Sequence, residues 1–443
     1  MKYLFFWALI LGLWAKTFAQ SPDSLRLPFA IADEKRLSDE DLKNKREGTY
    51  VTGVPDFSSD PVNGFGYGGE GSLFFNGKRS DPFFAYTAYR ARLDLVLFNT
   101  TRAQREIMLK LDVPYVFNTK WRCRLEGGYE SNPNLLYFGN TEQSLAGLSY
   151  YPGLDSSLTP VNNATYANYE QNGLIGVNQF YHTYIKKEYI LNVSGERSFL
   201  DGTLRTLIGY EIAHVSISTF QGNSLLQNDF ASKKISGLGK GLVGILQLGL
   251  IYDTRDLETD PGKGIFAELT NELSLKSAGS AYNFNKTFAH LNIYQNLIPG
   301  KYKKLILAAR LAIGYTYADA PFFEYQDQWS SEGSIEGLGG AHTIRGYKQS
   351  RFMSRVMTFN NLEFRYRFAQ TTLLKQHLAF VAVPFFDAGG VWDELSGLGY
   401  FSNYRYNSGL GLRIVWNVNT VLRFDYAISK EDKQFFFNLS HAF

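Results

Sequence analysis

The sequence predicts an all-β fold, namely a transmembrane antiparallel β-barrel in an exported protein. Three observations lead to this fold class. They are an apolar leader, a series of about fifteen segments in which apolar and polar residues alternate, and a composition rich in aromatic residues and glycine, with 35 Phe, 29 Tyr and 41 Gly in 443 residues. Strands that face lipid on one side and a polar lumen on the other need this alternation.

The leader comes first along the chain. A lysine follows the first methionine, residues 3–15 are nearly all apolar, and residues 17–19 (TFA) form a small-x-small cleavage site. The alternative is a membrane anchor, but the apolar run is shorter than the roughly 20 residues that a spanning helix needs. We therefore expect residues 1–19 to be a cleaved signal peptide and the protein to be exported.

Residues 20–47 are polar and rich in charge, with few apolar residues that could anchor them. This composition predicts a flexible or loosely helical periplasmic lead-in. After it, helical periodicity almost vanishes and period-2 alternation takes over. We therefore assign residues 48–443 to a single barrel domain.

Alternation is clearest late in the chain. In residues 405–418 the even positions are mostly large and apolar, whereas the odd positions are mostly Arg, Asn or Gly. A dry core would not accommodate so many charges on its inward face, but a wide, water-filled lumen does. Because single-chain bacterial barrels have an even number of strands, we expect about 16. The strand missing from our count is expected within residues 132–177.

The last segment alternates toward a terminal aromatic residue, Phe443. We expect it to close the barrel against the first barrel strand, which we place at Gly64–Gly71. Glycine weakens strands, so this pairing predicts a weak seam. The alternative is that these glycines make room for a tight bend or for an inserted loop. The seam residues predicted in this way are Gly64, Gly66, Gly68, Gly69, Gly71 and Phe443.

Other function classes find little support. A net charge of +3 does not indicate a nucleic-acid-binding surface. The single cysteine, Cys123, excludes an intramolecular disulfide, and the six histidines show no metal-ligand spacing. Neither a phosphate-binding loop nor a nucleophile elbow is present. We therefore expect no enzyme, no metal and no small-molecule cofactor.

Six motifs resemble, in sequence and in order, those of the BamA/TamA superfamily of outer-membrane assembly barrels, also called the bacterial surface antigen family. The first is the turn sequence YDTRDLETDPGKGIFAEL at 252–269. The others are TIRGYKQSRF at 343–352, NNLEFRYRF at 360–368, FFDAGGVW at 385–392, LRFDYAIS at 422–429 and FFFNLSHAF at 435–443.

The resemblance implies that the loop between the eleventh and twelfth strands folds into the lumen. Its motif places Arg345, Gly346 and Tyr347 there, and the acidic partners of Arg345 would be Glu363 and Asp387. A guanidinium group can engage two carboxylates at once, which lysine cannot do. We interpret these residues as a lock that holds the loop, in preference to a direct role in moving substrate.

The turn motif contributes a second set of polar residues. A charged active site is one interpretation of this set, but a staple for a periplasmic turn is the one we favour. The residues concerned are Asp253, Arg255, Asp256, Pro261 and Gly264.

The N-terminal half, at 48–75 and 81–90, resembles superfamily barrels that lack periplasmic POTRA repeats and are best known among Bacteroidetes. The 20–47 lead-in is too short to hold even one such domain. The resemblance implies non-enzymatic insertion, assembly or translocation of outer-membrane proteins or lipids. A passive pore and an accessory barrel on a larger complex are the alternatives. Expected partners are outer-membrane lipids and client proteins or accessory lipoproteins, but not nucleic acid.

Overall fold

A computed structural model of the chain describes residues 27–31, 36–37, 42, 45–174, 178–258, 260–298, 304–373, 376–416 and 420–443. The expected signal peptide and much of the expected lead-in therefore lie outside the described residues. Within these ranges, no helix combines the length and the apolar character needed to cross a membrane.

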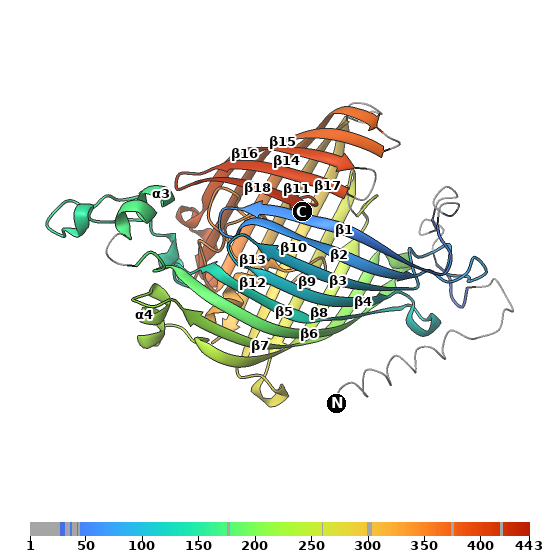
Figure 1. The fold of residues 1–443 in the computed structure, drawn as a ribbon, viewed down its shortest axis with the longest axis horizontal. Coiled ribbons are helices and arrows are strands. Elements are labelled where there is room, and N and C mark those ends of the chain that lie inside the picture. The colour runs from blue at the N-terminus through green and yellow to red at the C-terminus, as the bar shows by residue number, and fades with distance from the viewer. Residues whose placement is uncertain are drawn as a thin grey trace.

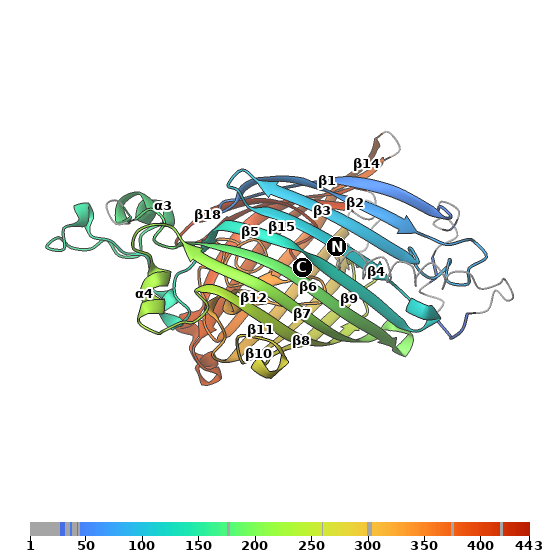
Figure 2. The ribbon, with the colours of Figure 1, turned by 60° about the horizontal axis from the view of Figure 1, so that its bottom comes forward.

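Sixteen antiparallel strands form one closed barrel (Figures 1 and 2). Each strand pairs with its neighbours in sequence, and β18 pairs with β1 to complete the ring. The wall consists of β1 (Thr49–Asp60), β2 (Gly64–Phe75), β3 (Ala91–Thr100), β4 (Arg105–Val113), β5 (Trp121–Leu136), β6 (Thr183–Phe199), β7 (Leu204–Thr219), β8 (Gly239–Asp253), β9 (Gly264–Ser274), β10 (Phe284–Ile298), β11 (Lys304–Ala318), β14 (Val356–Leu373), β15 (Gln376–Trp392), β16 (Arg405–Trp416), β17 (Thr420–Ile428) and β18 (Lys433–Leu439).

The expected 16-stranded barrel is confirmed, but the expected position of the missing strand is wrong. The strand that our count lacked is β1, whereas residues 137–174 contain short helical turns and one isolated bridge between Tyr150 and Val161. β1 escaped notice because its sequence, TYVTGVPDFSSD, has short and polar residues on both faces and a proline in the middle. Proline is tolerated at sheet edges, where no ladder hydrogen bond is lost.

The two faces of the wall carry opposite kinds of side chain, as the alternation predicts. Leu410 and Phe386 are exposed on the outer face, which meets lipid, whereas Arg413, Arg423 and Asp425 are fully buried on the inner face. Buried charges on the lumen side require partners, because an isolated charge in a confined space is costly. The inner wall is therefore a paired polar surface.

Connections at the two ends of the barrel differ in length. At one end, the long-loop end, lie the β5–β6 connection (137–182), the β7–β8 connection (220–238) and the β11–β14 connection (319–355). Figure 1 shows this end on the left, marked by α3 and α4. The other end, the short-turn end, carries mainly tight turns. Outer-membrane barrels expose long loops outside and short turns to the periplasm.

Short helices lie in the connections. They are η2 (Val116–Asn118), η3 (Glu142–Leu145), η4 (Pro152–Leu154), α3 (Tyr166–Asn168), η5 (Tyr169–Gly173), η6 (Leu200–Gly202), α4 (Leu225–Ala231), η7 (Lys276–Ala278), η8 (Phe322–Gln326), η9 (Leu395–Gly399) and η10 (Phe401–Asn403).

The β11–β14 connection lies inside the barrel and contains η8 and a two-stranded sheet, β12 (Asp327–Gln328) with β13 (Ile335–Glu336). Phe322 and Phe323 pack on β6, β7 and β8, whereas Leu338 and Ile344 pack against β14 and β15. The loop therefore bridges opposite parts of the wall. We refer to this connection as the luminal loop.

Candidate functional site: the luminal loop and the seam

The tip of the luminal loop is a tight turn that places Arg345 against the barrel wall. Gly339 and Gly340 adopt φ values of 120° and 92°, a region that side chains disfavour. A Cβ on Gly346 would lie 2.6 Å from the Cβ of Asn407 on β16. Glycine at these positions therefore permits both the turn and the close approach.

Arg345 is fully buried and contacts the two carboxylates predicted from the sequence. Its Nε and Nη2 donate to Asp387 on β15 at 2.9 and 2.8 Å, and its Nη1 donates to Glu363 on β14 at 2.7 Å. The guanidinium carbon also lies 3.5 Å from the centroid of the Phe385 ring. Burial alone would lower the pKa of Arg345, but the surrounding carboxylates raise it well above its ordinary value. The group is a permanent cation.

A third carboxylate belongs to the same site and was absent from the predicted set. Nη1 of Arg345 donates to Asp425 on β17 at 3.0 Å. A sequence signal did exist, because Asp425 lies in the motif LRFDYAIS, on the polar face of its strand. Strand alternation identified the face, but it does not reveal which strands lie within reach of a loop tip.

Further arginines on the wall share these carboxylates. Arg365 donates to Glu363 at 2.9 Å, and Arg413 donates to Asp425 at 2.5 Å and to Glu363 at 3.4 Å. Arg423 lies 3.8 Å from Asp425. We call the set of Arg345, Glu363, Asp387, Asp425, Arg365, Arg413 and Arg423 the arginine network. It joins the luminal loop to β14, β15, β16 and β17.

Tyr347, the last residue of the predicted lock, lies outside this network. It packs in an apolar cluster with Phe352 and Ile344, and its ring centroid is 5.1 Å from that of Phe352. The carbonyl of Tyr347 accepts from the Gly340 amide at 3.0 Å, which closes the loop tip. Tyr347 therefore shapes the turn and makes no contact with the carboxylates.

The turn motif between β8 and β9 forms a polar staple. Asp253 accepts two hydrogen bonds from the Arg255 guanidinium, both at 3.0 Å. Asp256 accepts from the Gly262 amide at 2.8 Å, on the far side of Pro261. Gly264, at φ 109°, would place a Cβ 2.3 Å from the Thr254 carbonyl oxygen.

The staple also contacts the luminal loop. Nη2 of Arg255 lies 2.5 Å from a carboxylate oxygen of Glu332. Asp260, in the same turn, lies 3.0 Å from His441 and 3.0 Å from Arg367. The geometry is that of a structural turn linked to the loop. The described residues contain no cluster of His, Cys, Asp and Glu side chains that could hold a metal ion.

The seam between β1 and β18 is incomplete. Among the residues that the structure describes, Ser59 and Phe437 are the one pair that joins the two strands, and they lie close to the long-loop end. β18 stops at Leu439, and Ser440 adopts a φ of 77° that turns the chain away from the wall. Continuing the register would place residues 440–443 opposite Gly53–Asp56. Instead, the Ser440 amide donates to the Val421 carbonyl of β17 at 2.8 Å, and residues 441–443 turn into the barrel. The outer edge of Thr49–Ser58 therefore has no strand partner within the described part of the chain.

Two expectations about the seam are wrong. Phe443 is not on the closing strand, because its ring lies in the lumen, 4.8 Å from the Arg310 guanidinium carbon and 5.3 Å from that of Arg365. The predicted seam glycines all lie in β2, the second strand, between β1 and β3. A Cβ on Gly66 or Gly68 would meet Phe98 or Leu97 of β3 at 2.2 Å. These two glycines thus make room for the neighbouring strand β3, a role that neither interpretation anticipated.

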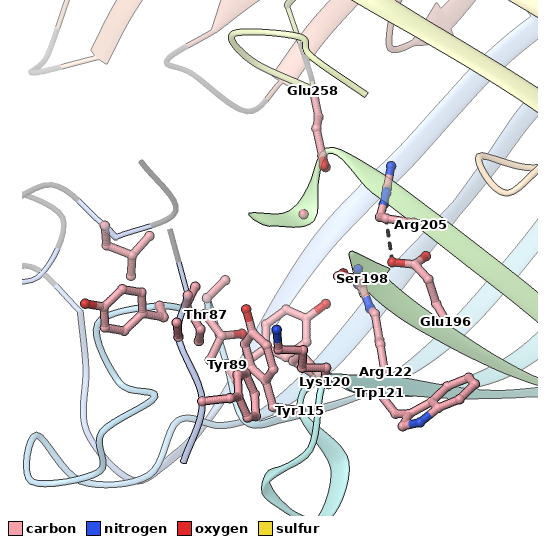
Figure 3. A pocket seen from close by; sticks show the side chains of 18 residues that line it. Thr87, Tyr89, Tyr115, Lys120, Trp121, Arg122, Glu196, Ser198, Arg205 and Glu258 are labelled. Atoms are coloured by element: carbon pink, nitrogen blue, oxygen red, sulfur yellow. Dashed lines mark hydrogen bonds and ion pairs between the residues drawn. The ribbon is translucent and has the colours of Figure 1, made fainter. Parts of the chain in front are cut away.

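A cavity of about 510 Å³ opens at the short-turn end (Figure 3). Phe29 of the lead-in, Tyr89 and Tyr115 line it on one side. Arg205 and Glu196, 3.4 Å apart, lie on the other side, where Figure 3 marks their ion pair. The lead-in reaches this place by packing on the β2–β3 connection, where the Leu37 amide donates to the Ala85 carbonyl at 2.8 Å.

These features define a class, the 16-stranded outer-membrane barrel whose lumen is occupied by an inserted loop held by a buried arginine. Residues 104–443 match the Omp85 superfamily domain. The chain belongs to the Omp85 superfamily, and the predicted BamA/TamA-type barrel is confirmed. Residues 27–90 match a domain of unknown function, DUF5982. That segment comprises residues 27–47 of the lead-in, β1, β2 and the β2–β3 connection.

Two solved structures share the fold. BamA from Haemophilus ducreyi lacking POTRA domains 1–3 is 14% identical, with a TM-score of 0.54, and the match covers 89% of this chain and 70% of that one. CdiB from Escherichia coli is 10% identical, with a TM-score of 0.51, and the match covers 88% of this chain and 63%, less than two thirds, of CdiB. No curated protein matches the chain.

Proposed function

We propose that this chain inserts or translocates polypeptides at the outer membrane, without enzymatic chemistry, through the seam between β1 and β18. The observation that carries the proposal is the incomplete seam in an otherwise continuous barrel. Every other pair of neighbouring strands is joined by at least seven recorded residue pairs, whereas β1 and β18 share one. Membership of the Omp85 superfamily supports the same function.

The free edge of β1 offers a template for a client strand. Thr49–Ser58 pair with β2 on one side only, so their outward backbone groups lack a strand partner. An extended peptide can add to such an edge through main-chain hydrogen bonds, which do not depend on client sequence. In the hydrocarbon region an unpaired backbone group is costly, so a client strand that pairs with β1 is stabilised.

The occupied lumen argues against a passive pore. The luminal loop packs on opposite parts of the wall, and the arginine network fixes its tip. A permanent channel would need this loop to leave the lumen, which would break a fully buried set of ion pairs. We therefore infer that client polypeptides pass along the seam and not through the centre of the barrel.

Depletion of the protein in its native host, followed by quantitative outer-membrane proteomics and lipid analysis, tests the proposed function. Loss of a defined set of barrels from the outer membrane is the expected result. Defective lipid asymmetry with an unchanged set of barrels would show that lipids are the substrate. Defective solute uptake alone would instead establish a pore and overturn the proposal.

A further inference from the structure

The β5–β6 connection extends across the seam at the long-loop end. It leaves the wall at β5 and returns at β6, and four strands, β1 to β4, separate β5 from the seam. Nevertheless, the Tyr166 amide in this connection donates to the carbonyl of Glu431 at 2.8 Å. Glu431 lies in the β17–β18 turn, on the far side of the seam. The connection therefore contacts both sides of it.

On the β1 side the contact is apolar. Val62, in the turn between β1 and β2, is buried in a cluster with Phe138 and Tyr166 of the β5–β6 connection. Asn134 at the end of β5 donates from Nδ2 to Asn63 Oδ1 at 3.3 Å and to the Arg102 carbonyl at 2.7 Å. The turn that ends β1 is thus held by the connection and by β5.

On the β18 side the contact is ionic and passes through the luminal loop. Arg351 donates to Glu431 at 2.6 and 3.0 Å, and to the carbonyls of Ser144 and Ala146 in the β5–β6 connection at 2.6 and 2.9 Å. Arg351 is almost fully buried. A buried guanidinium bound to a carboxylate and two carbonyls is costly to expose, because the groups left behind lose a charged hydrogen-bond donor.

A second cation strengthens the same contact. The Lys348 ammonium lies 4.8 Å from the centroid of the Tyr166 ring and 3.4 Å from Asp432, the residue after Glu431. The β5–β6 connection, the luminal loop and the β17–β18 turn therefore meet at one place. We refer to Tyr166, Val62, Arg351, Lys348 and Glu431 as the brace.

We propose that the brace keeps the seam shut at the long-loop end, so that the seam opens only from the short-turn end. The pairing agrees with this polarity, because Ser59 and Phe437 pair close to the brace and β18 ends at Leu439, two residues farther along. A client strand arriving from the periplasmic side then meets an open edge, while the outer end stays closed. The inference that client strands enter at the short-turn end of the seam rests on the proposed function.

Distances between nitroxide labels test the polarity without any client. One label pair, at Pro61 and Lys430, spans the seam at the long-loop end, and a second pair, at Val51 and Leu422, spans it at the short-turn end. All variants carry Cys123→Ser, because Cys123 is the only native cysteine. In vesicles of bacterial outer-membrane lipids, we expect a narrow distance distribution for the first pair and a broad one for the second.

Brace variants complete the test. Tyr166→Ala, alone and combined with Arg351→Gln, should abolish the narrow distribution of the long-loop pair and leave the short-turn pair as broad as before. Tyr151→Ala is the matched control, because Tyr151 lies in the same connection but is 43% exposed. The single variant keeps the test valid if the double variant does not fold.

Two results would overturn the proposed polarity. One is a long-loop distribution as broad as the short-turn distribution in the intact protein. The other is a long-loop distribution that stays narrow in folded Tyr166→Ala protein. Neither result bears on client insertion, whose test is the depletion experiment, so the two proposals can fail separately.

Discussion

Arg345 is the residue on which the account of the lumen depends. It was predicted together with Glu363 and Asp387 because the resemblance supplied the motif and alternation placed Glu363 on the polar face. Asp425 was missed because its contact with Arg345 depends on the position of β17 relative to the loop tip. Strand register determines this position, and the residue pattern of a single strand does not reveal it. Phe443 was misplaced because alternation continues through Ser440 in the sequence, whereas the backbone turns there.

Arg345→Ala should lower the amount of heat-stable folded barrel more than Arg345→Lys does. Alanine leaves three buried carboxylates without their central cation, and breaking a buried ion pair costs about 3–5 kcal/mol. Lysine keeps the charge but not the bidentate geometry, so we expect partial rescue. The fraction of heat-modifiable protein on gels measures the effect, and wild-type behaviour of both variants would exclude the lock.

Asp425→Asn tests the member of the network that sequence reasoning missed. The change keeps the shape but removes a charge that faces Arg345 and Arg413. We expect a loss of thermal stability comparable to that of Glu363→Gln, of the order of 1–3 kcal/mol. Asp155→Asn, at an exposed loop carboxylate, is the control and should be neutral. If Asp425→Asn unfolds at the wild-type temperature, Asp425 does not belong to the lock.

At the scale of elements, β1 and the β5–β6 connection are the parts that sequence patterns described worst. β1 carries short and polar residues on both faces and Pro55 at its centre, so it lacks the alternation of a wall strand. The β5–β6 connection is irregular, and its role comes from a contact with a turn more than 250 residues away. The other wall strands, in which apolar and polar residues alternate, were located correctly.

The brace should weaken in acid because of His182, which lies at the base of the β5–β6 connection. Its Nδ1 donates to the Tyr137 carbonyl and its Nε2 accepts from the Tyr169 hydroxyl, both at 2.9 Å. Burial, reinforced by nearby Arg351, lowers the pKa of His182 to about 4. The unfolded value is about 6.5, so the stabilisation is complete above pH 6.5 and is lost as the pH falls through 4.

The nitroxide pair at Pro61 and Lys430 measures this effect. Its distance distribution should be narrow at pH 7 and broad near pH 4. His182→Gln keeps a hydrogen-bonding side chain without the titration, so it isolates the contribution of His182. An equal acid response in wild type and His182→Gln would show that His182 is not the group responsible.

At the scale of the whole molecule, sixteen strands form the ring of the barrel and the luminal loop occupies its interior. The seam between β1 and β18 is paired over only part of its length. The strand number and the inserted loop follow from the amino-acid pattern and from the family resemblance. The position along the barrel at which β1 and β18 pair does not follow from the amino-acid pattern. It depends on where β18 ends and on which turn the β5–β6 connection contacts. Both are set by long-range packing.

Purified protein in planar bilayers should show no steady conductance, because the luminal loop bridges opposite walls. Arg345→Ala should produce transient openings, since it frees the loop tip from the wall. A heat-stability assay on the same reconstituted preparation is the control, because it shows whether unfolded protein contributes to the openings. A steady wild-type conductance that Arg345→Ala leaves unchanged would mean that the loop does not close the lumen.

A disulfide across the lower seam tests the central claim, that clients pass between β1 and β18. Phe57→Cys with Leu439→Cys continues the Ser59–Phe437 register toward the short-turn end. The matched control, Leu97→Cys with Ile107→Cys, joins β3 to β4 at a recorded pair, and both variants carry Cys123→Ser. In depleted cells complemented with each variant, oxidation should abolish client assembly only for the seam pair, and reduction should restore it. Undiminished assembly with the seam fully crosslinked would contradict the account.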